Sequence, residues 1–90
     1  MHIADLVWRD PILAKIEGKH HVTQDEVESA FFDDRPYIRN FGNVYHAYGR
    51  TRDGRYLFIP FVYLGRKRAL PLTARDMTRR ERQLYRNEAR

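Results

Sequence analysis

The stretch that most restricts the fold is residues 55–64, RYLFIPFVYL. It is apolar at nearly every position rather than at alternate ones, so a strand built from it must be covered on both faces. Asp53-Gly54 precedes it and residues 44–51 precede that turn, which predicts a two-residue type I′ hairpin. Pro60 cannot donate to a strand ladder, so we expect a bulge or an open edge there.

Two helices are expected before this hairpin. Asp10 and Pro11 have the residue types of an N-cap and a first helical position, and Gly18 is a plausible end for that helix. Thr23 and Glu26 then have the spacing of a capping box, in which each side chain bonds the other residue's backbone amide. The second helix is therefore expected to begin directly after Thr23.

The C-terminal half predicts more strands and one last helix. Residues 37–41 are expected to form a strand, and residues 69–75 alternate so that Leu70 and Arg75 fall on opposite faces. Thr78 and Glu81 form a second capping box. The prediction is an α+β fold: a single small domain over residues 1–90, with an antiparallel meander sheet of 3–4 strands, two N-terminal helices and one C-terminal helix. The last few residues are expected to fray.

Composition excludes several classes of site. The chain has no cysteine, which excludes a disulfide framework and a cysteine-built zinc site, and fits a cytoplasmic protein. Its histidines lack the spacing of a metal site, so no metal is predicted. Without a glycine-rich phosphate loop or a catalytic serine motif, no cofactor is predicted either. No apolar run approaches the roughly 18 residues of a membrane span, so no membrane partner is expected.

Positive charge is concentrated in the last quarter of the chain. The net charge is +5, yet residues 65–90 hold nine Lys/Arg against three Asp/Glu. The preceding 64 residues hold eight against nine. A localised basic surface indicates an anionic partner, either a nucleic acid or an acidic protein.

The last helix carries this charge on one side. At about 100° per residue, Arg79, Arg82, Arg86 and Arg90 fall within about 80° of arc. Neither acid of the helix, Glu81 or Glu88, has an arginine three or four residues away, and Asp76 pairs with Arg79 only if the helix begins earlier. A solvated charged face is the ordinary explanation of such a helix. Here the charges have one sign, are arginines, and begin at the helix N-terminus, where the dipole disfavours cations. These features favour a functional surface that binds phosphate or carboxylate.

Two further groups are candidates for RNA contact. Lys19 and His20 lie between the first two helices, where they can contact phosphate and move a proton or form an ordinary polar junction. His46, Tyr48 and Arg50 share one face of a strand, where they can stack bases and hold phosphate or simply pack at a sheet edge.

Three blocks resemble the BrnT family of toxins. They are KHHVTQDEVESAFFDD, GRTRDGRYLFIPFVYL and ALPLTARDMTRRERQLY, in the same order as in that family. The resemblance runs from about Trp8 to Tyr85. One departure is His21, which stands where the family signature has glycine.

The resemblance implies a RelE-like fold and a metal-independent ribonuclease toxin of a type II toxin–antitoxin system, which cleaves RNA and inhibits translation. A cognate antitoxin and an RNA substrate are the implied partners. Whether that RNA is ribosome-associated, and whether the chain is a homodimer, stay open. The expected catalytic residues are Arg75, Arg79, Arg80 and His20. The expected RNA-binding residues are Lys19, His46, Tyr48, Arg50, Arg82 and Arg86.

Two alternatives stay open at this point. One is a non-catalytic nucleic-acid- or protein-binding module that uses the arginine surface. The other is a DNA-binding regulator, which no helix-turn-helix pattern supports because a strand precedes the final helix.

Overall fold

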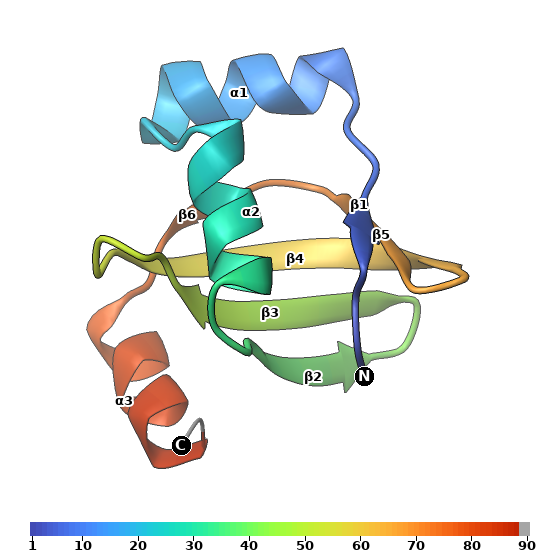
Figure 1. Cartoon of the computed structure of the whole chain (residues 1–90). Helices are drawn as coiled ribbons and strands as arrows, with labels where there is room; N and C mark the ends of the chain where they lie inside the picture. Colours follow the sequence, from blue (N-terminus) through green and yellow to red (C-terminus); the bar gives the residue numbers. More distant parts are fainter. Residues whose placement is uncertain (89–90) are drawn as a thin grey trace.

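The computed structural model describes residues 1–88, over which three helices pack on a mixed sheet (Figure 1). The elements are β1 (Asp5–Leu6), α1 (Asp10–His20), α2 (Gln24–Phe32), β2 (Tyr37–Phe41), β3 (Val44–Arg50), β4 (Tyr56–Gly65), β5 (Arg68–Pro71), β6 (Arg75–Asp76) and α3 (Arg79–Glu88). The α+β single-domain prediction is confirmed. Within residues 1–88 the sheet has six strands rather than the predicted 3–4, and β1 pairs with β5 in parallel. No helix of this described part is long and apolar enough to cross a membrane.

β4 is the central strand, with β3 along one side and β5 and β6 along the other. One of its faces meets α1 and α2 in the larger core, where Leu57 and Phe61 are fully buried. On the other face, Phe58 packs with Met77 and Tyr85 in a smaller core that α3 covers. The prediction of a strand covered on both faces is confirmed for this part of β4. In Figure 1, α3 (red) lies at the end of the sheet where β4 begins.

α2 lies unusually close to β3 because of Gly49. A Cβ at Gly49 would lie 2.7 Å from the carbonyl oxygen of Ala30 in α2. Any larger residue would push this helix off the sheet, so glycine is required here by packing rather than by backbone conformation.

The end of α1, at the junction with α2, differs from the prediction. α1 continues past Gly18 to His20, and His21 ends it in the left-handed conformation (φ 54°). The Val22 amide then donates to the Ile16 carbonyl at 3.0 Å across this left-handed residue. Arg9, rather than Asp10, occupies the N-cap position of α1. The capping box that begins α2 is confirmed.

The β3–β4 connection is not the predicted two-residue type I′ turn. That turn needs positive φ at both central residues, but only Gly54 of the pair has it (φ 92°). The Thr51 amide donates to the Arg55 carbonyl at 2.8 Å, and the Gly54 amide donates to the Thr51 carbonyl at 2.9 Å. The loop is therefore one residue longer, and Arg55 lies at its end rather than inside β4.

A break between β5 and β6 reverses the predicted direction of Arg75. Pro71 lies opposite Phe61, and an unbroken strand would then place Ala74 opposite Phe58. Arg75 occupies that position instead. The one-residue shift turns Arg75 onto the face that also carries Leu70, so the predicted strict alternation was wrong.

Pro60 lies opposite this break, and its carbonyl accepts from the Leu72 amide at 2.9 Å. In a strand, a residue's nitrogen and carbonyl point to the same side, so the missing N–H of Pro60 faces the gap. The open edge expected at Pro60 is confirmed, while its pairing with His46 on the other side is regular.

Candidate functional site

Arg75 is stacked on the sheet face that α1 and α2 leave uncovered. It lies on β6 directly opposite Phe58, and its guanidinium carbon is 4.3 Å from the centre of the Phe58 ring. Tyr48 continues the row on β3, opposite Phe58. These aromatic rings fix the height and tilt of the guanidinium above the sheet, and Phe58 supplies a cation–π contact.

Only one end of the Arg75 guanidinium is occupied. Nη1 and Nη2 donate to the two carboxylate oxygens of Glu81 at 2.8 and 2.9 Å, and Nη1 also donates to the Asp76 carbonyl at 3.0 Å. An arginine has five N–H donors. The Nε–H and one Nη2–H of Arg75 therefore have no acceptor within residues 1–88. These two donors form a fork of the kind that binds two oxygens of one phosphate.

Glu81 is itself held in place by the start of α3. Its Oε1 accepts from the Thr78 amide at 2.8 Å, and the Thr78 hydroxyl accepts from the Glu81 amide at 3.2 Å. This is the predicted capping box. Burial alone would raise the pKa of Glu81, but the bonds from Arg75 and Thr78 outweigh it and hold the pKa below its ordinary value. Glu81 is thus a fixed anion that orients Arg75.

His46 shares this face with Arg75. Its ring meets Phe58 edge-on at 4.9 Å between centroids and lies 4.4 Å from the Phe41 ring. Partial burial and the nearby positive charges of Arg39 and Arg75 lower the pKa of His46, although Glu81 acts in the opposite direction. The imidazole is therefore neutral at pH 7 and can accept a proton.

Arg39 is a member of this group that sequence reasoning missed. It lies directly opposite His46 in the β2–β3 pairing, and its guanidinium carbon is 5.0 Å from the centre of the exposed Phe41 ring. Only the register reveals it, since nothing in the local sequence distinguishes Arg39 from other surface arginines. Strands β2 to β6 contain one carboxylate, that of Asp76, which points to the opposite side. The charged side chains that these strands place on the Arg75 face are therefore all basic.

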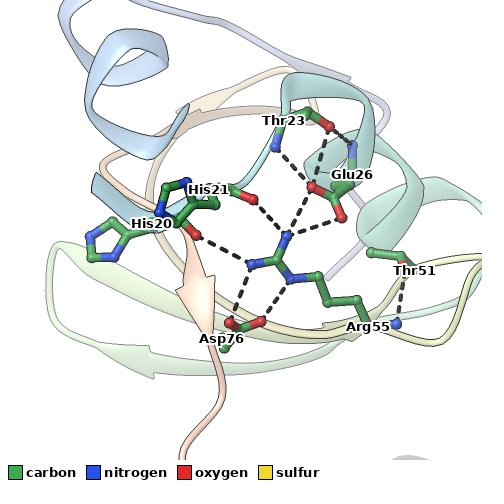
Figure 2. Close-up of polar contacts among 7 residues, drawn as sticks. All are labelled: His20, His21, Thr23, Glu26, Thr51, Arg55 and Asp76. Carbon is green, nitrogen blue, oxygen red and sulfur yellow. Dashed lines mark hydrogen bonds and ion pairs between the residues drawn. The ribbon is translucent and has the colours of Figure 1, made fainter. Parts of the chain in front are cut away.

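Arg55 forms a second polar cluster on the other side of β6 (Figure 2). Nε and Nη2 bind the Asp76 carboxylate at 2.7 and 3.2 Å, and Nη1 binds Glu26 at 3.0 Å. Nη1 and Nη2 also donate to the carbonyls of His21 and His20 at 2.8 and 3.3 Å. All five donors are used, so Arg55 has none left for a ligand.

The Arg55 cluster is therefore structural. It joins the α1–α2 junction and the adjacent capping box of α2 to β6, which is far from both in sequence. The bonds to the Asp76 carboxylate raise the pKa of Arg55 and lower that of Asp76. Sequence reasoning missed this residue because its partners lie 21 to 35 positions away.

The predicted residues do not form one group. His20 lies with Arg55 and Asp76, so β6 separates it from the Arg75 side chain. Lys19 is exposed at the end of α1. Arg79 and Arg80 are exposed in the first turn of α3, with no ion pair to residues 1–88.

The remaining predicted contacts also lie on the Arg75 face, with Tyr48 beside Phe58 and three arginines around Tyr56. Tyr48 is 4% exposed and belongs to the smaller core, so its ring packs rather than faces solvent. Arg50, Arg82 and Arg86 gather around Tyr56. Arg90, the fourth arginine of the predicted helix face, lies outside the described residues. Nowhere in residues 1–88 do three His, Asp or Glu side chains come together as they would around a metal ion.

The similarity of this chain to known proteins is one of structure. No protein-family model matches the chain, and no curated protein matches it in sequence. Among solved structures it is similar to the crystal structure of the Brucella abortus ribonuclease toxin BrnT, with a TM-score of 0.66 and 14% identity. The match covers 83% of this chain and 97% of the toxin. At this identity the similarity establishes the architecture, and the chain therefore has the fold of the BrnT toxin.

Proposed function

We propose that this chain is a metal-independent ribonuclease toxin of a type II toxin–antitoxin system. The main support for the proposal is the guanidinium of Arg75, which keeps two free N–H donors. Glu81 fixes its orientation, and it stacks on Phe58 beside a neutral His46. The fold of a ribonuclease toxin supports it. The basic face supports an RNA substrate and an antitoxin that covers the same surface.

The chemistry requires only groups that this face supplies. The 2′-oxygen of one nucleotide attacks the adjacent phosphorus, so the P–O2′ bond forms while the P–O5′ bond breaks. The products are a 2′,3′-cyclic phosphate and a 5′-hydroxyl, whose oxygen takes a proton from water as it leaves. Arg75 would bind the non-bridging oxygens through its free fork and stabilise the charge that develops on them. One such preorganised donor contributes about 10²–10³ in rate.

His46 is the better placed of the two candidate bases. It lies on the Arg75 face and is neutral at pH 7, so it can accept the 2′-hydroxyl proton. His20 lies across β6 from Arg75. Arg79 and Arg80 begin the helix that carries Glu81, and their exposed side chains suit flanking phosphates. Lys19 would contact RNA only beyond the edge of this face.

The direct test uses the purified protein, single-stranded RNA and EDTA. We expect the wild type to cleave, and Arg75→Ala to cleave about 10²–10³-fold more slowly. The matched control is Arg52→Ala, because Arg52 is exposed in the β3–β4 loop and pairs with Asp33 away from this face. In a bacterial host, induction of the wild type should arrest growth and that of Arg75→Ala should not.

Two outcomes would count against the proposal. If the wild type binds RNA without cutting it and leaves growth unaffected, the chain is a binding module instead. If Arg75→Ala cleaves as fast as Arg52→Ala, the ribonuclease stands but its site is elsewhere.

A further inference from the structure

Three arginines from two distant segments surround one tyrosine ring at the end of the Arg75 face. The guanidinium carbons of Arg82, Arg50 and Arg86 lie 4.6, 5.7 and 5.9 Å from the centre of the Tyr56 ring. Tyr56 is held by an edge contact with Tyr85, 5.9 Å between centroids, and Tyr85 is 8% exposed. The Tyr56 ring is thus held in place and contacts three arginine side chains, one from β3 and two from α3.

We propose that these four residues form a second phosphate-binding site for a single-stranded RNA, separate from Arg75. The proposal rests on the proposed function, since it concerns how the same substrate is held. It adds a site with its own geometry to the general expectation that these arginines contact RNA.

The charges around Tyr56 lack the partners that neighbouring arginines have. Arg52 pairs with Asp33, Arg55 with Glu26 and Asp76, and Arg75 with Glu81. Within residues 1–88 no ion pair involves an arginine of the Tyr56 group. Burial and, to a smaller extent, the charge of Asp34 raise the pKa of Tyr85, yet Asp34 forms no ion pair with these arginines.

Three like charges held together repel one another. A cation–π contact at an exposed site offsets only a small part of this repulsion for each cation. A bound anion would relieve the remaining repulsion, and guanidinium forks match the geometry of phosphate oxygens.

The position of the group favours a polymer of phosphates. Tyr56 and Phe58 are two residues apart on β4, so they point to the same face with about 7 Å between their Cα atoms. Arg75 stands on Phe58, and the three arginines stand on Tyr56. Two anion sites side by side on one strand can hold neighbouring parts of one RNA chain and thereby position the phosphate at Arg75.

The test measures binding rather than cleavage. A fluorescently labelled single-stranded oligodeoxynucleotide, which lacks the 2′-hydroxyl and cannot be cut, is titrated with the protein at several salt concentrations. Arg82→Ala with Arg86→Ala should weaken binding about tenfold or more. The slope of log K against log salt should become shallower by about 0.7 for each phosphate that the variant no longer neutralises.

Tyr56→Leu distinguishes the effect of the arrangement of the arginines from the effect of net charge, because it removes the aromatic ring without removing a cation. It should weaken binding severalfold, and Tyr56→Phe, which keeps the ring, should recover the affinity that Tyr56→Leu loses. Circular dichroism checks that each variant is folded, and the double arginine variant decides the matter if Tyr56→Leu is not. Arg52→Ala, with one charge removed elsewhere, should change affinity less than twofold.

Other results overturn the site. If the double arginine variant loses no more binding affinity per removed charge than Arg52→Ala does, binding depends only on the net charge of the protein. If oligonucleotide affinity is unchanged in all variants while binding of poly-glutamate falls, the arginines recognise an acidic protein instead. Because the probe is not cleaved, wild-type binding with the expected slopes but no ribonuclease activity would refute the proposed function and leave the site intact.

Discussion

Glu81 binds both terminal nitrogens of Arg75 and, through the same carboxylate, accepts the backbone amide of Thr78. One side chain therefore begins α3 and aims the guanidinium that stands on the sheet. This coupling connects a local helix signal in the sequence to the geometry of the proposed phosphate site.

Replacing Glu81 with glutamine separates these two roles. Glutamine can still accept the Thr78 amide, but it loses the charge and one of the two acceptors that face Arg75. We expect the free energy of unfolding to fall by about 1 kcal/mol, since the pair is only partly buried. We expect RNA cleavage to fall about tenfold, through kcat more than KM, because a misdirected Arg75 stabilises the transition state poorly. Urea titration and single-turnover kinetics measure the two effects; an unchanged kcat in a destabilised variant would make Glu81 structural only.

The pH dependence of cleavage should report His46. A general base must be neutral, so activity should fall as the pH drops through the pKa of His46, which lies below the ordinary 6.5. Arg39 is one of the charges that lower this pKa. Arg39→Gln should therefore raise it, and the acidic limb of the kcat/KM profile should move to higher pH. A limb that stays in place in Arg39→Gln but disappears in His20→Ala would assign the base to His20 instead.

The sequence identifies local structure well where signals are short-range. Both capping boxes form as predicted, and the two-sided apolar run becomes the central strand. Each of these depends on residues within four positions of one another or on a simple periodicity, and such signals survive in the folded chain.

The predictions fail where the structure depends on contacts between segments that are distant in sequence. The one-residue shift between Pro71 and Arg75 depends on how both strands pair with β4, so alternation along the chain alone predicted the wrong face. The structural role of Arg55 could not be recognised in the sequence, because its partners come from the α1–α2 junction, α2 and β6. The separation of His20 from Arg75 has the same origin, since β6 passes between them only in the folded sheet.

His21 offers a test of stored backbone strain. It ends α1 in the left-handed conformation (φ 54°), which costs a residue with a Cβ about 1 kcal/mol relative to glycine. His21→Gly should therefore stabilise the protein by about 1 kcal/mol in urea unfolding, because its backbone carbonyl still accepts from Arg55. His21→Ala is the control, and it should give no such gain. Equal stabilisation by both substitutions would mean that the imidazole, rather than the backbone, is unfavourable.

Acid should weaken the ion pairs of the Arg55 cluster. The bonds from Arg55 hold the pKa of Asp76 below its ordinary 3.8, and bonds from Thr23 and Arg55 outweigh burial to hold that of Glu26 below 4.5. A carboxyl whose pKa is depressed by folding adds stability at pH values above its unfolded pKa. That stability is lost as the pH falls through the folded pKa, here below about 4.5.

Asp76→Asn should therefore cost stability at pH 7, about 1 kcal/mol or less because the Asp76 side chain is 64% exposed. The cost should shrink as the pH falls below the ordinary 3.8 of this carboxyl, because a protonated Asp76 no longer carries the charge that pairs with Arg55. Urea unfolding at pH 7, 5, 4 and 3 measures this convergence, and Asp53→Asn, an exposed loop carboxyl without an ion pair to residues 1–88, is the matched control. Parallel curves for the wild type and Asp76→Asn across this range would show that Arg55 draws its stability from the backbone carbonyls of His20 and His21 instead.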